Sequence, residues 1–232
     1  MSGRPAGTDV SSWQHVDNAP IDWERARADG CTFVIVKATQ GVGYVNPWLL
    51  RDLDDARAAG LLVGAYHFYD VGVPADEQAT HFVSSLIGQA LDLGCWLDWE
   101  PPGLPSWEAK SLVEAFCVKV GEVRPWCGLY CDRWWHEQLV AATLGPIRLW
   151  IADPSADASP PGTILRQTVT WGNNSAIDGA DYDELVSRRG LDIPTSPRPR
   201  PAGAPVHAEP EHAEPPAAVA ATPGDEDDEP AG

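Results

Sequence analysis

The sequence predicts an α/β protein, an irregular TIM-like (β/α) barrel followed by a disordered tail. Over the first 190 residues, short apolar runs alternate with amphipathic stretches, which is the pattern of successive βα units. Eight strand candidates are present, and helix candidates follow at least the first four, as expected for a closed barrel. The last strands are too closely spaced for full helices, so we expect the barrel to be irregular there.

The expected strands are short apolar runs bounded by turn residues. They are residues 7–10, 32–37, 62–68, 94–99, 127–130, 148–152, 164–170 and 179–182. An open, doubly wound sheet is the structural alternative. It lacks support because no glycine-rich phosphate loop follows the first strand.

Four helices are expected between the early strands, at residues 22–29, 47–59, 74–87 and 106–123. Gly30 and Gly60 end the first two helices. Pro74 opens the third, with acidic residues beside it as the helix dipole prefers. Ser106 is the expected N-cap of the fourth helix.

The domain boundary is predicted near residue 190. All 11 tryptophans precede it, and residues 1–190 supply enough apolar surface for one barrel domain. Residues 191–232 are rich in Pro, Ala, Glu and Asp, and such a segment cannot bury enough apolar area to offset its ordering entropy. We therefore expect a disordered, extended tail.

The charge of the chain excludes several classes of partner. The formal net charge is −18, and the nine acidic and two basic residues after residue 190 account for −7, which leaves −11 for the barrel. Nucleic acid and anionic membrane surfaces are disfavoured because binding them needs a basic patch. No run is long enough for a transmembrane helix. The Trp and Tyr content fits a sugar-binding groove, although most of these rings are expected to belong to the core.

Cysteines and the N-terminus bear on metal binding and compartment. The five cysteines lack CxxC or Cys/His spacing, so neither a disulfide framework nor a metal site is expected; a Cys127–Cys131 bond is left open. Residues 1–8 contain no apolar segment typical of a secretory signal. We therefore expect a protein made in the cytoplasm that reaches an external substrate only after release.

The strongest local signal for chemistry is GCWLDWEPP at residues 94–102. An apolar strand ends in Asp98 and Glu100, and period-2 alternation puts both carboxylates on one face, with Cα atoms roughly 6.5 to 7 Å apart. Catalytic groups of such barrels lie at the carboxyl ends of strands. One neutral and one ionised carboxyl group suit glycosidic bond cleavage. The alternative is that both acids only begin a solvated loop.

Two further acids lie in strand candidates at opposite ends of the fold. Asp9 belongs to the first strand candidate and Asp181 to the eighth. The first and eighth strands of a closed barrel are neighbours, so both acids are expected at the same rim as Asp98 and Glu100. The alternatives are a turn or N-cap role for Asp9 and an Asx-turn for Asp181.

Six sequence blocks occur in a fixed order along the chain. They are DVSSWQ (residues 9–14), FVIVKATQG (33–41), AGLLVGAYHF (59–68), LDWE (97–100), GLY (128–130) and LWIA (149–152), with ADYD (180–183) after them. Together they resemble the glycoside hydrolase family 25 lysozymes, which include fungal and Streptomyces muramidases and many phage endolysins. The resemblance covers about residues 8–185.

The resemblance implies a role for each acid. Glu100 would protonate the leaving glycosidic oxygen, and Asp98 would stabilise the oxocarbenium or oxazolinium ion with help from the 2-acetamido group of the substrate. Asp9 and Asp181 would orient groups around this pair. The implied substrate-binding side chains are Trp13, Lys37, Tyr66, Phe68, Tyr130 and Trp150. The bond cut would be the β-1,4 link from N-acetylmuramic acid to N-acetylglucosamine, without a metal or organic cofactor; the attacking group is left open.

The chain departs from the family pattern at three positions. Gln40 stands where the family usually has Glu, Pro154 where an aromatic residue follows the LWIA strand, and Arg166 where Trp precedes the glutamine. Two more predictions concern neighbouring strands. His67 is expected to pack outward, because Tyr66 points to the opposite face, and a half-buried Lys37 is expected to pair with a carboxylate at the rim.

The sequence therefore predicts a monomeric peptidoglycan hydrolase that acts on the wall after release, as endolysins do. Two rival interpretations are kept. One is a catalytically inactive barrel that binds glycan or serves as a structural component of a virion. The other is a related hydrolase that acts on a different envelope glycan.

Overall fold

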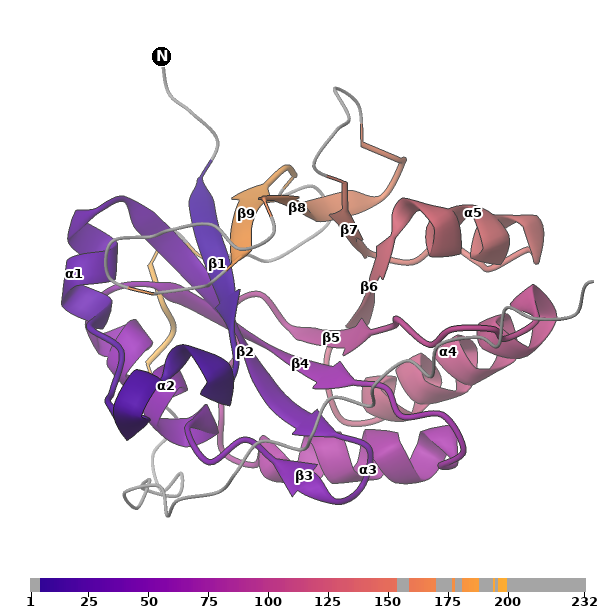
Figure 1. Ribbon diagram of the computed structural model, residues 1–232, viewed down its shortest axis with the longest axis horizontal. Coiled ribbons are helices and arrows are strands. Elements are labelled where there is room, and N and C mark those ends of the chain that lie inside the picture. Colours follow the sequence, from indigo (N-terminus) through magenta and orange to yellow (C-terminus); the bar gives the residue numbers. More distant parts are fainter. Residues whose placement is uncertain are drawn as a thin grey trace, which may run out of the picture.

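The computed structural model describes residues 5–153, 159–169, 177, 181–187, 194 and 196–199. Its centre is a nine-stranded sheet in the order β1-β9-β8-β7-β6-β5-β4-β2-β3, which an additional β1–β2 pairing closes into a barrel (Figure 1). The strands are β1 (Ala6–Val10), β2 (Cys31–Gln40), β3 (Tyr44–Val45), β4 (Leu62–Phe68), β5 (Cys95–Asp98), β6 (Cys127–Asp132), β7 (Leu149–Ala152), β8 (Thr163–Val169) and β9 (Asp181–Leu185). The predicted barrel is confirmed.

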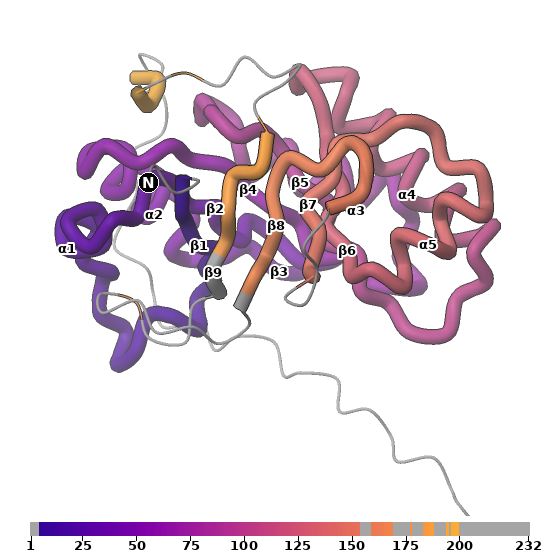
Figure 2. Tube along the Cα trace, turned by 90° about the horizontal axis from the view of Figure 1, so that it is seen from above, coloured from indigo at the N-terminus to yellow at the C-terminus, as the bar shows by residue number. Residues whose placement is uncertain are grey.

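The barrel is mixed rather than fully parallel. β9 pairs antiparallel with both β1 and β8, and the three lie side by side when the molecule is seen from above (Figure 2). β3 is a two-residue strand that pairs antiparallel with the end of β2. The sequence did not predict β3 or the direction of β9.

Helices surround the barrel unevenly. They are α1 (Trp23–Ala28), α2 (Leu49–Ala58), α3 (Ala75–Ser85), α4 (Ser106–Gly121) and α5 (Arg133–Ala141). α5 was not predicted and connects β6 to β7. Because of α5, the part of the barrel without helices is shorter than expected; within the described residues no helix follows β7 or β8.

The N-cap predicted for α4 is wrong by one residue. Pro105 is the N-cap and Ser106 is the first helical residue, with no side-chain cap in this helix. The fixed φ of proline suits the residue that enters a helix, so the helix begins directly after it.

No helix among the described residues is long and apolar enough to cross a membrane.

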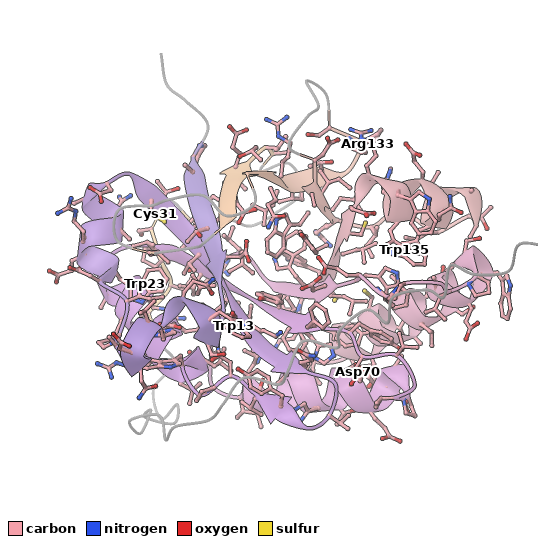
Figure 3. All side chains as sticks on the ribbon, viewed as in Figure 1. Trp13, Trp23, Cys31, Asp70, Arg133 and Trp135 are labelled. Carbon is pink, nitrogen blue, oxygen red and sulfur yellow. The ribbon has the colours of Figure 1, made fainter. Side chains whose placement is uncertain are left out.

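Two apolar clusters hold the fold together, one inside the barrel and one between the strands and the helices, to which Trp23 and Trp135 belong (Figure 3). Phe33 and Ile35 of β2 belong to the cluster inside the barrel, while the alternating Val34 and Val36 belong to the cluster that packs against the helices. This alternation follows from the period of two residues along a strand. Trp96 fills the barrel interior so tightly that a Cβ at Gly128 would lie 2.5 Å from its ring.

Candidate active site

β5 presents the two carboxyl groups of the LDWE segment. Trp96 belongs to the cluster inside the barrel and Trp99 to the outer one, so alternation along the strand turns Asp98 toward the interior. Asp98 is only 8 % exposed, and its Oδ1 is buried without a hydrogen-bond partner among the described residues. Glu100 lies two residues further on and is exposed. The pair therefore combines a buried carboxyl group with an accessible one.

The charges around Asp98 show which groups gather at this rim. Burial raises the pKa of Asp98 well above its ordinary value, the charges of Glu100 and Asp9 raise it further, and the ammonium of Lys37 opposes them. Burial and the same three carboxylates also raise the pKa of the Tyr130 phenol. The structure thus brings Asp9, Asp98 and Glu100 together, although Asp9 lies some ninety residues from the others in the sequence.

Asp181 joins this group through its backbone position. In the antiparallel β1–β9 pair, Asp181 is the register partner of Asp9. The predicted neighbourhood of the first and last strands is confirmed. The orientation of the Asp181 side chain lies outside what the structure describes, so its role stays a prediction.

Asp9 is connected to β6 and β8 by a chain of hydrogen bonds. The Tyr130 hydroxyl donates to Gln167 Oε1 at 2.9 Å, and Gln167 Nε2 donates to Asp9 Oδ2 at 3.2 Å. Gln167 is only 3 % exposed, so its amide orientation is determined by these two partners. Gln167 was not predicted as a site residue.

Lys37 does not form the predicted contact with a carboxylate. Its Nζ donates to Gln40 Oε1 at 2.8 Å and lies 4.6 Å from the centre of the Phe68 ring. Gln40 lies three residues further along β2, after the shift in the β2–β4 register between Lys37 and Thr39, and its amide oxygen takes the place of the predicted carboxylate as the partner of Nζ. Burial lowers the pKa of Lys37, while Asp98 and Glu100 raise it, so both rim acids still act on it through space.

The predicted aromatic residues fall into two environments. Trp150 is buried beneath Tyr130 and Tyr66, with ring centres 4.6 and 6.2 Å away, and its Nε1 donates to Asp183 Oδ1 at 2.8 Å. Trp150 therefore belongs to the buried cluster inside the barrel that supports these tyrosines, and its ring is not exposed to a substrate. Trp13 is 64 % exposed in the short 3-10 helix Ser12–Gln14 that follows β1. A ring this exposed is accessible for stacking on a sugar.

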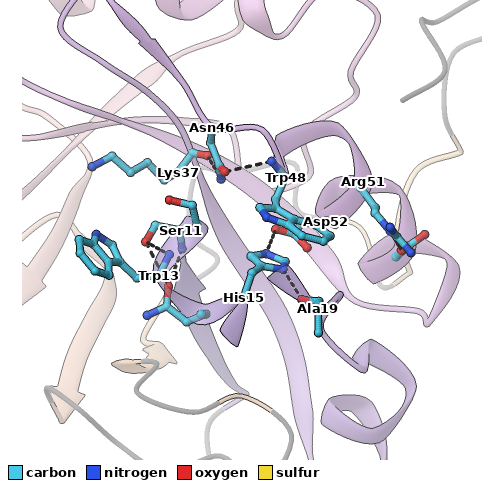
Figure 4. A network of polar contacts seen from close by, with 12 residues as sticks. Ser11, Trp13, His15, Ala19, Lys37, Asn46, Trp48, Arg51 and Asp52 are labelled. Atoms are coloured by element: carbon cyan, nitrogen blue, oxygen red, sulfur yellow. Dashed lines mark hydrogen bonds and ion pairs between the residues drawn. The ribbon is translucent and has the colours of Figure 1, made fainter. Parts of the chain in front are cut away.

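The segment after β1 is held in place by a buried polar network (Figure 4). His15 Nε2 lies 2.9 Å from Asp52 Oδ2, its Nδ1 donates to the Ala19 carbonyl, and its ring stacks on Trp48 at 3.8 Å. Because a carbonyl can only accept, Nδ1 is the donor to Ala19, and Nε2 is the ring atom that faces Asp52. The network fixes the segment that carries Trp13 onto α2.

The remaining predictions concern residues away from the carboxyl groups of the site. His67 packs outward as predicted and is fully buried, where Thr39 Oγ1 lies 2.7 Å from its Nδ1 and Gln78 Oε1 3.0 Å from its Nε2. Arg166 donates to Glu184 Oε2 at 2.9 Å, which ties β8 to β9. Pro154 lies outside the described residues. All five cysteines are free, so the Cys127–Cys131 bond left open by the sequence is not formed.

Comparisons with known proteins identify the family. The model of the glycosyl hydrolases family 25 matches residues 8–177. The autolytic lysozyme of Clostridium acetobutylicum is 30 % identical over 77 % of this chain and 55 % of its own length. The N,O-diacetylmuramidase of Chalaropsis sp. is 32 % identical over 42 % of this chain and 47 % of its own length.

The chain thus spans about half the length of these two curated relatives. A solved structure of a family 25 glycosyl hydrolase from Bacillus anthracis has the same fold, with a TM-score of 0.71, 18 % identity and coverage of 82 % of this chain and 92 % of that one. With the family match extending over most of the barrel, the chain belongs to glycosyl hydrolases family 25.

Proposed function

We propose that this protein is a muramidase that cleaves the β-1,4 bond between N-acetylmuramic acid and N-acetylglucosamine in peptidoglycan. The observation that carries the proposal is the meeting of Asp9, Asp98 and Glu100 at one end of the barrel, beside the ammonium of Lys37. Family membership and the lysozyme and muramidase names of the relatives support the choice of substrate.

Glu100 is the proposed general acid. Two interacting carboxyl groups titrate as a pair, and the pair holds a proton to a higher pH than either group alone would. Asp98 is buried, whereas Glu100 is exposed and can deliver that proton to a leaving oxygen. Lys37 opposes the effect of burial on Asp98 and favours its ionised form. Burial still keeps the pKa of Asp98 well above its ordinary value, so our assignment of the shared proton to Glu100 rests on the exposure of Glu100, and Asp98 carries the negative charge once it has ionised.

Asp98 is the proposed stabiliser of positive charge at the anomeric centre. A buried carboxylate interacts more strongly with a nearby cation than one surrounded by water. In our proposal it acts on an oxocarbenium or oxazolinium ion formed with the substrate's own 2-acetamido group. Asp9 and Asp181 orient the reacting groups, with Gln167 holding the Asp9 carboxylate.

The sugar-binding part of the proposal rests on the aromatic side chains around the acids. Tyr66 and Phe68 lie on β4 and Tyr130 lies on β6, the two strands that pair with β5. Phe68 and Tyr130 are the register partners of Asp98. Trp13 adds an exposed ring beside β1, while Trp150 supports Tyr130 from below. We propose that the protein acts as a monomer on wall glycan strands, to which it gains access after release.

The test is mass spectrometry of the muropeptides released from purified walls. The wild type is expected to release fragments with N-acetylmuramic acid at the new reducing end. Glu100→Gln keeps the shape of the side chain but cannot donate a carboxylic proton, so its rate is expected to fall at least 100-fold. Glu122→Gln, an exposed substitution next to Lys119 at the end of α4, is the matched control and should leave the rate unchanged.

Two outcomes would contradict the proposal. If the wild type released no reducing sugar from any wall, the protein would be an inactive glycan-binding barrel. If it cleaved another envelope glycan and left peptidoglycan intact, the substrate would be wrong while the acids kept their roles.

A further inference from the structure

The turn between α3 and β5 is held by arginines from distant parts of the chain. This turn precedes β5, so it lies at the amino ends of the strands, opposite to the end where Asp98 lies. Guanidinium groups donate to four of its carbonyls: Arg57 to Ala90, Arg124 to Leu86 and Gln89, and Arg198 to Leu91. Two of these arginines belong to the barrel domain, but Arg198 belongs to the segment expected to be a disordered tail.

Asp92, in the same turn, is the second contact of Arg198. Its side chain is 3 % exposed, and its Oδ2 accepts from the Val63 backbone N–H at 3.2 Å. Its Oδ1 accepts from the Arg198 backbone N–H at 3.0 Å. Burial raises the pKa of Asp92, and the hydrogen bond and charge of Arg198 lower it. A buried carboxylate needs such partners, so the tail segment supplies part of what keeps Asp92 ionised.

A cavity of about 420 Å³ adjoins this contact, and Arg198 is one of its lining residues. Trp126 also lines it, with the Arg148 guanidinium 4.7 Å from the Trp126 ring centre. Gln89 also lines it, and the Gln89 side-chain amide is buried without a hydrogen-bond partner among the described residues. Arg124 and Arg148 line the cavity as well, so Asp92 is the acidic group there that accepts from the docked segment.

The sequence of the tail explains why this segment is the one that docks. The barrel and the tail both carry net negative charge, so a basic segment is the part of the tail that the net charge of the barrel repels least. Arg198 and Arg200 are the only basic residues after residue 190. Pro197 and Pro199 flank Arg198 and restrict the free chain, which lowers the entropy lost on docking.

We propose that the surface formed by Leu91, Asp92 and Trp126 at the amino ends of the strands is a docking site for residues 196–199 of this same chain. The docked segment lies at the end of the barrel opposite to Asp98. The surface lies within the part of the chain that matches the family model, whereas residues 196–199, its proposed occupant, lie beyond that part. The inference does not depend on the proposed activity.

The experiment measures hydrogen exchange of the Arg198 amide in the full chain labelled with 15N-arginine. In the wild type this amide is expected to exchange at least 10-fold more slowly than in a free peptide of residues 194–202, because it donates to a buried carboxylate. Asp92→Ala removes the acceptor and should abolish the protection without any change in the tail. Arg198→Ala, followed by a labelled alanine amide, should reduce the protection several-fold because the contact with Leu91 is lost.

Arg200→Ala is the matched control, because it removes the same charge two residues further along. It is expected to leave the protection of residue 198 within about two-fold of the wild type. No protection in the wild type, or equal losses from Arg198→Ala and Arg200→Ala, would overturn the proposal. Protection that grows with protein concentration, together with a dimer in sedimentation, would overturn it in favour of docking onto a second copy. If Asp92→Ala failed to fold, Arg198→Glu in place of it should abolish the protection.

Discussion

Lys37 places a positive charge close to the buried carboxyl group of Asp98, and this charge has a measurable consequence. Lys37→Met keeps a long apolar side chain and removes the ammonium that lowers the pKa of Asp98. The pKa of Asp98 should therefore rise further, so that Asp98 ionises only at a higher pH. We expect the rising limb of the kcat/KM profile to move to higher pH by about 1 to 3 units.

The profile is measured on soluble wall fragments at constant ionic strength. Lys119→Met, on the outer surface of α4, removes the same charge far from the rim and should not move the limb. An unchanged profile for Lys37→Met would mean that Asp98 does not have to ionise for the reaction.

Gln167 has a role that follows from its two hydrogen bonds. Gln167→Leu has a similar volume but neither accepts from Tyr130 nor donates to Asp9. A loss of orientation at Asp9 should lower kcat by about 10- to 100-fold while KM changes little, because the sugar contacts remain. Tyr130→Phe breaks only the first of the two hydrogen bonds and leaves the Gln167–Asp9 contact in place, so its loss in kcat should be smaller. A loss in kcat that matches the loss in free energy of unfolding, when both are expressed in kcal/mol, would instead indicate a purely structural role.

The acids could be predicted from the sequence because their chemistry carries a local signal. Asp98 and Glu100 stand at the end of an apolar strand followed by two prolines. Gln167 has no such signal: its partner Asp9 is 158 positions away, and a glutamine in a strand reads as an ordinary polar residue. The partner of Lys37 was mispredicted for a related reason, since the irregularity in β2 that brings Gln40 within reach is not visible in the sequence.

At the scale of elements, the packing of β4 against α3 depends on an uncharged histidine. His67 donates through Nε2 to Gln78 and accepts at Nδ1 from the Thr39 hydroxyl, because Gln78 Oε1 also accepts from the Asp70 N–H and so acts as an acceptor. Burial lowers the pKa of His67 from 6.5 to about 4. Below pH 6.5 the unfolded chain binds a proton that the folded one does not, so stability is lost as the pH falls toward 4.

This loss amounts to about 2 kcal/mol between pH 7.5 and pH 5, at roughly 1.4 kcal/mol per pH unit. In His67→Asn no group titrates at this position. The difference in free energy of unfolding between wild type and variant should therefore shrink by about 2 kcal/mol over this range. Denaturant unfolding at the two pH values measures it, and a difference that stays constant would show that His67 is protonated in the folded state.

The elements themselves were predicted unevenly, for reasons that differ. β4 is bounded by Gly60 and a turn, and its predicted range coincides with the observed one. α5 was missed although Asp132 caps it by accepting from the Trp135 N–H at 2.7 Å, because the later strands were expected to be too closely spaced for full helices. The direction of β9 could not be predicted, since alternation in a strand is the same read forward or backward.

At the scale of the whole molecule, closure of the barrel brings the first and last parts of the chain to the same rim. Asp9 of β1 is the register partner of Ile35 on β2 and of Asp181 on β9. The eight strand candidates, with helices after the early ones, predicted this closure. The docked position of Arg198 was not implied, because composition alone predicts disorder for residues 191–232 and carries no information about a buried acceptor such as Asp92.

The net charge of −18 predicts how the proposed enzyme meets its substrate. Wall polymers rich in carboxylate and phosphate groups repel a protein of the same sign, and this repulsion reaches about 30 Å at 0.01 M salt but only about 8 Å at 0.15 M. The initial rate of wall solubilisation should therefore rise several-fold between these concentrations. Sedimentation of Glu100→Gln with intact walls separates binding from turnover, and the bound fraction is expected to rise in parallel with the rate. A rate that falls with added salt would mean that a local positive surface, rather than the net charge, governs the encounter.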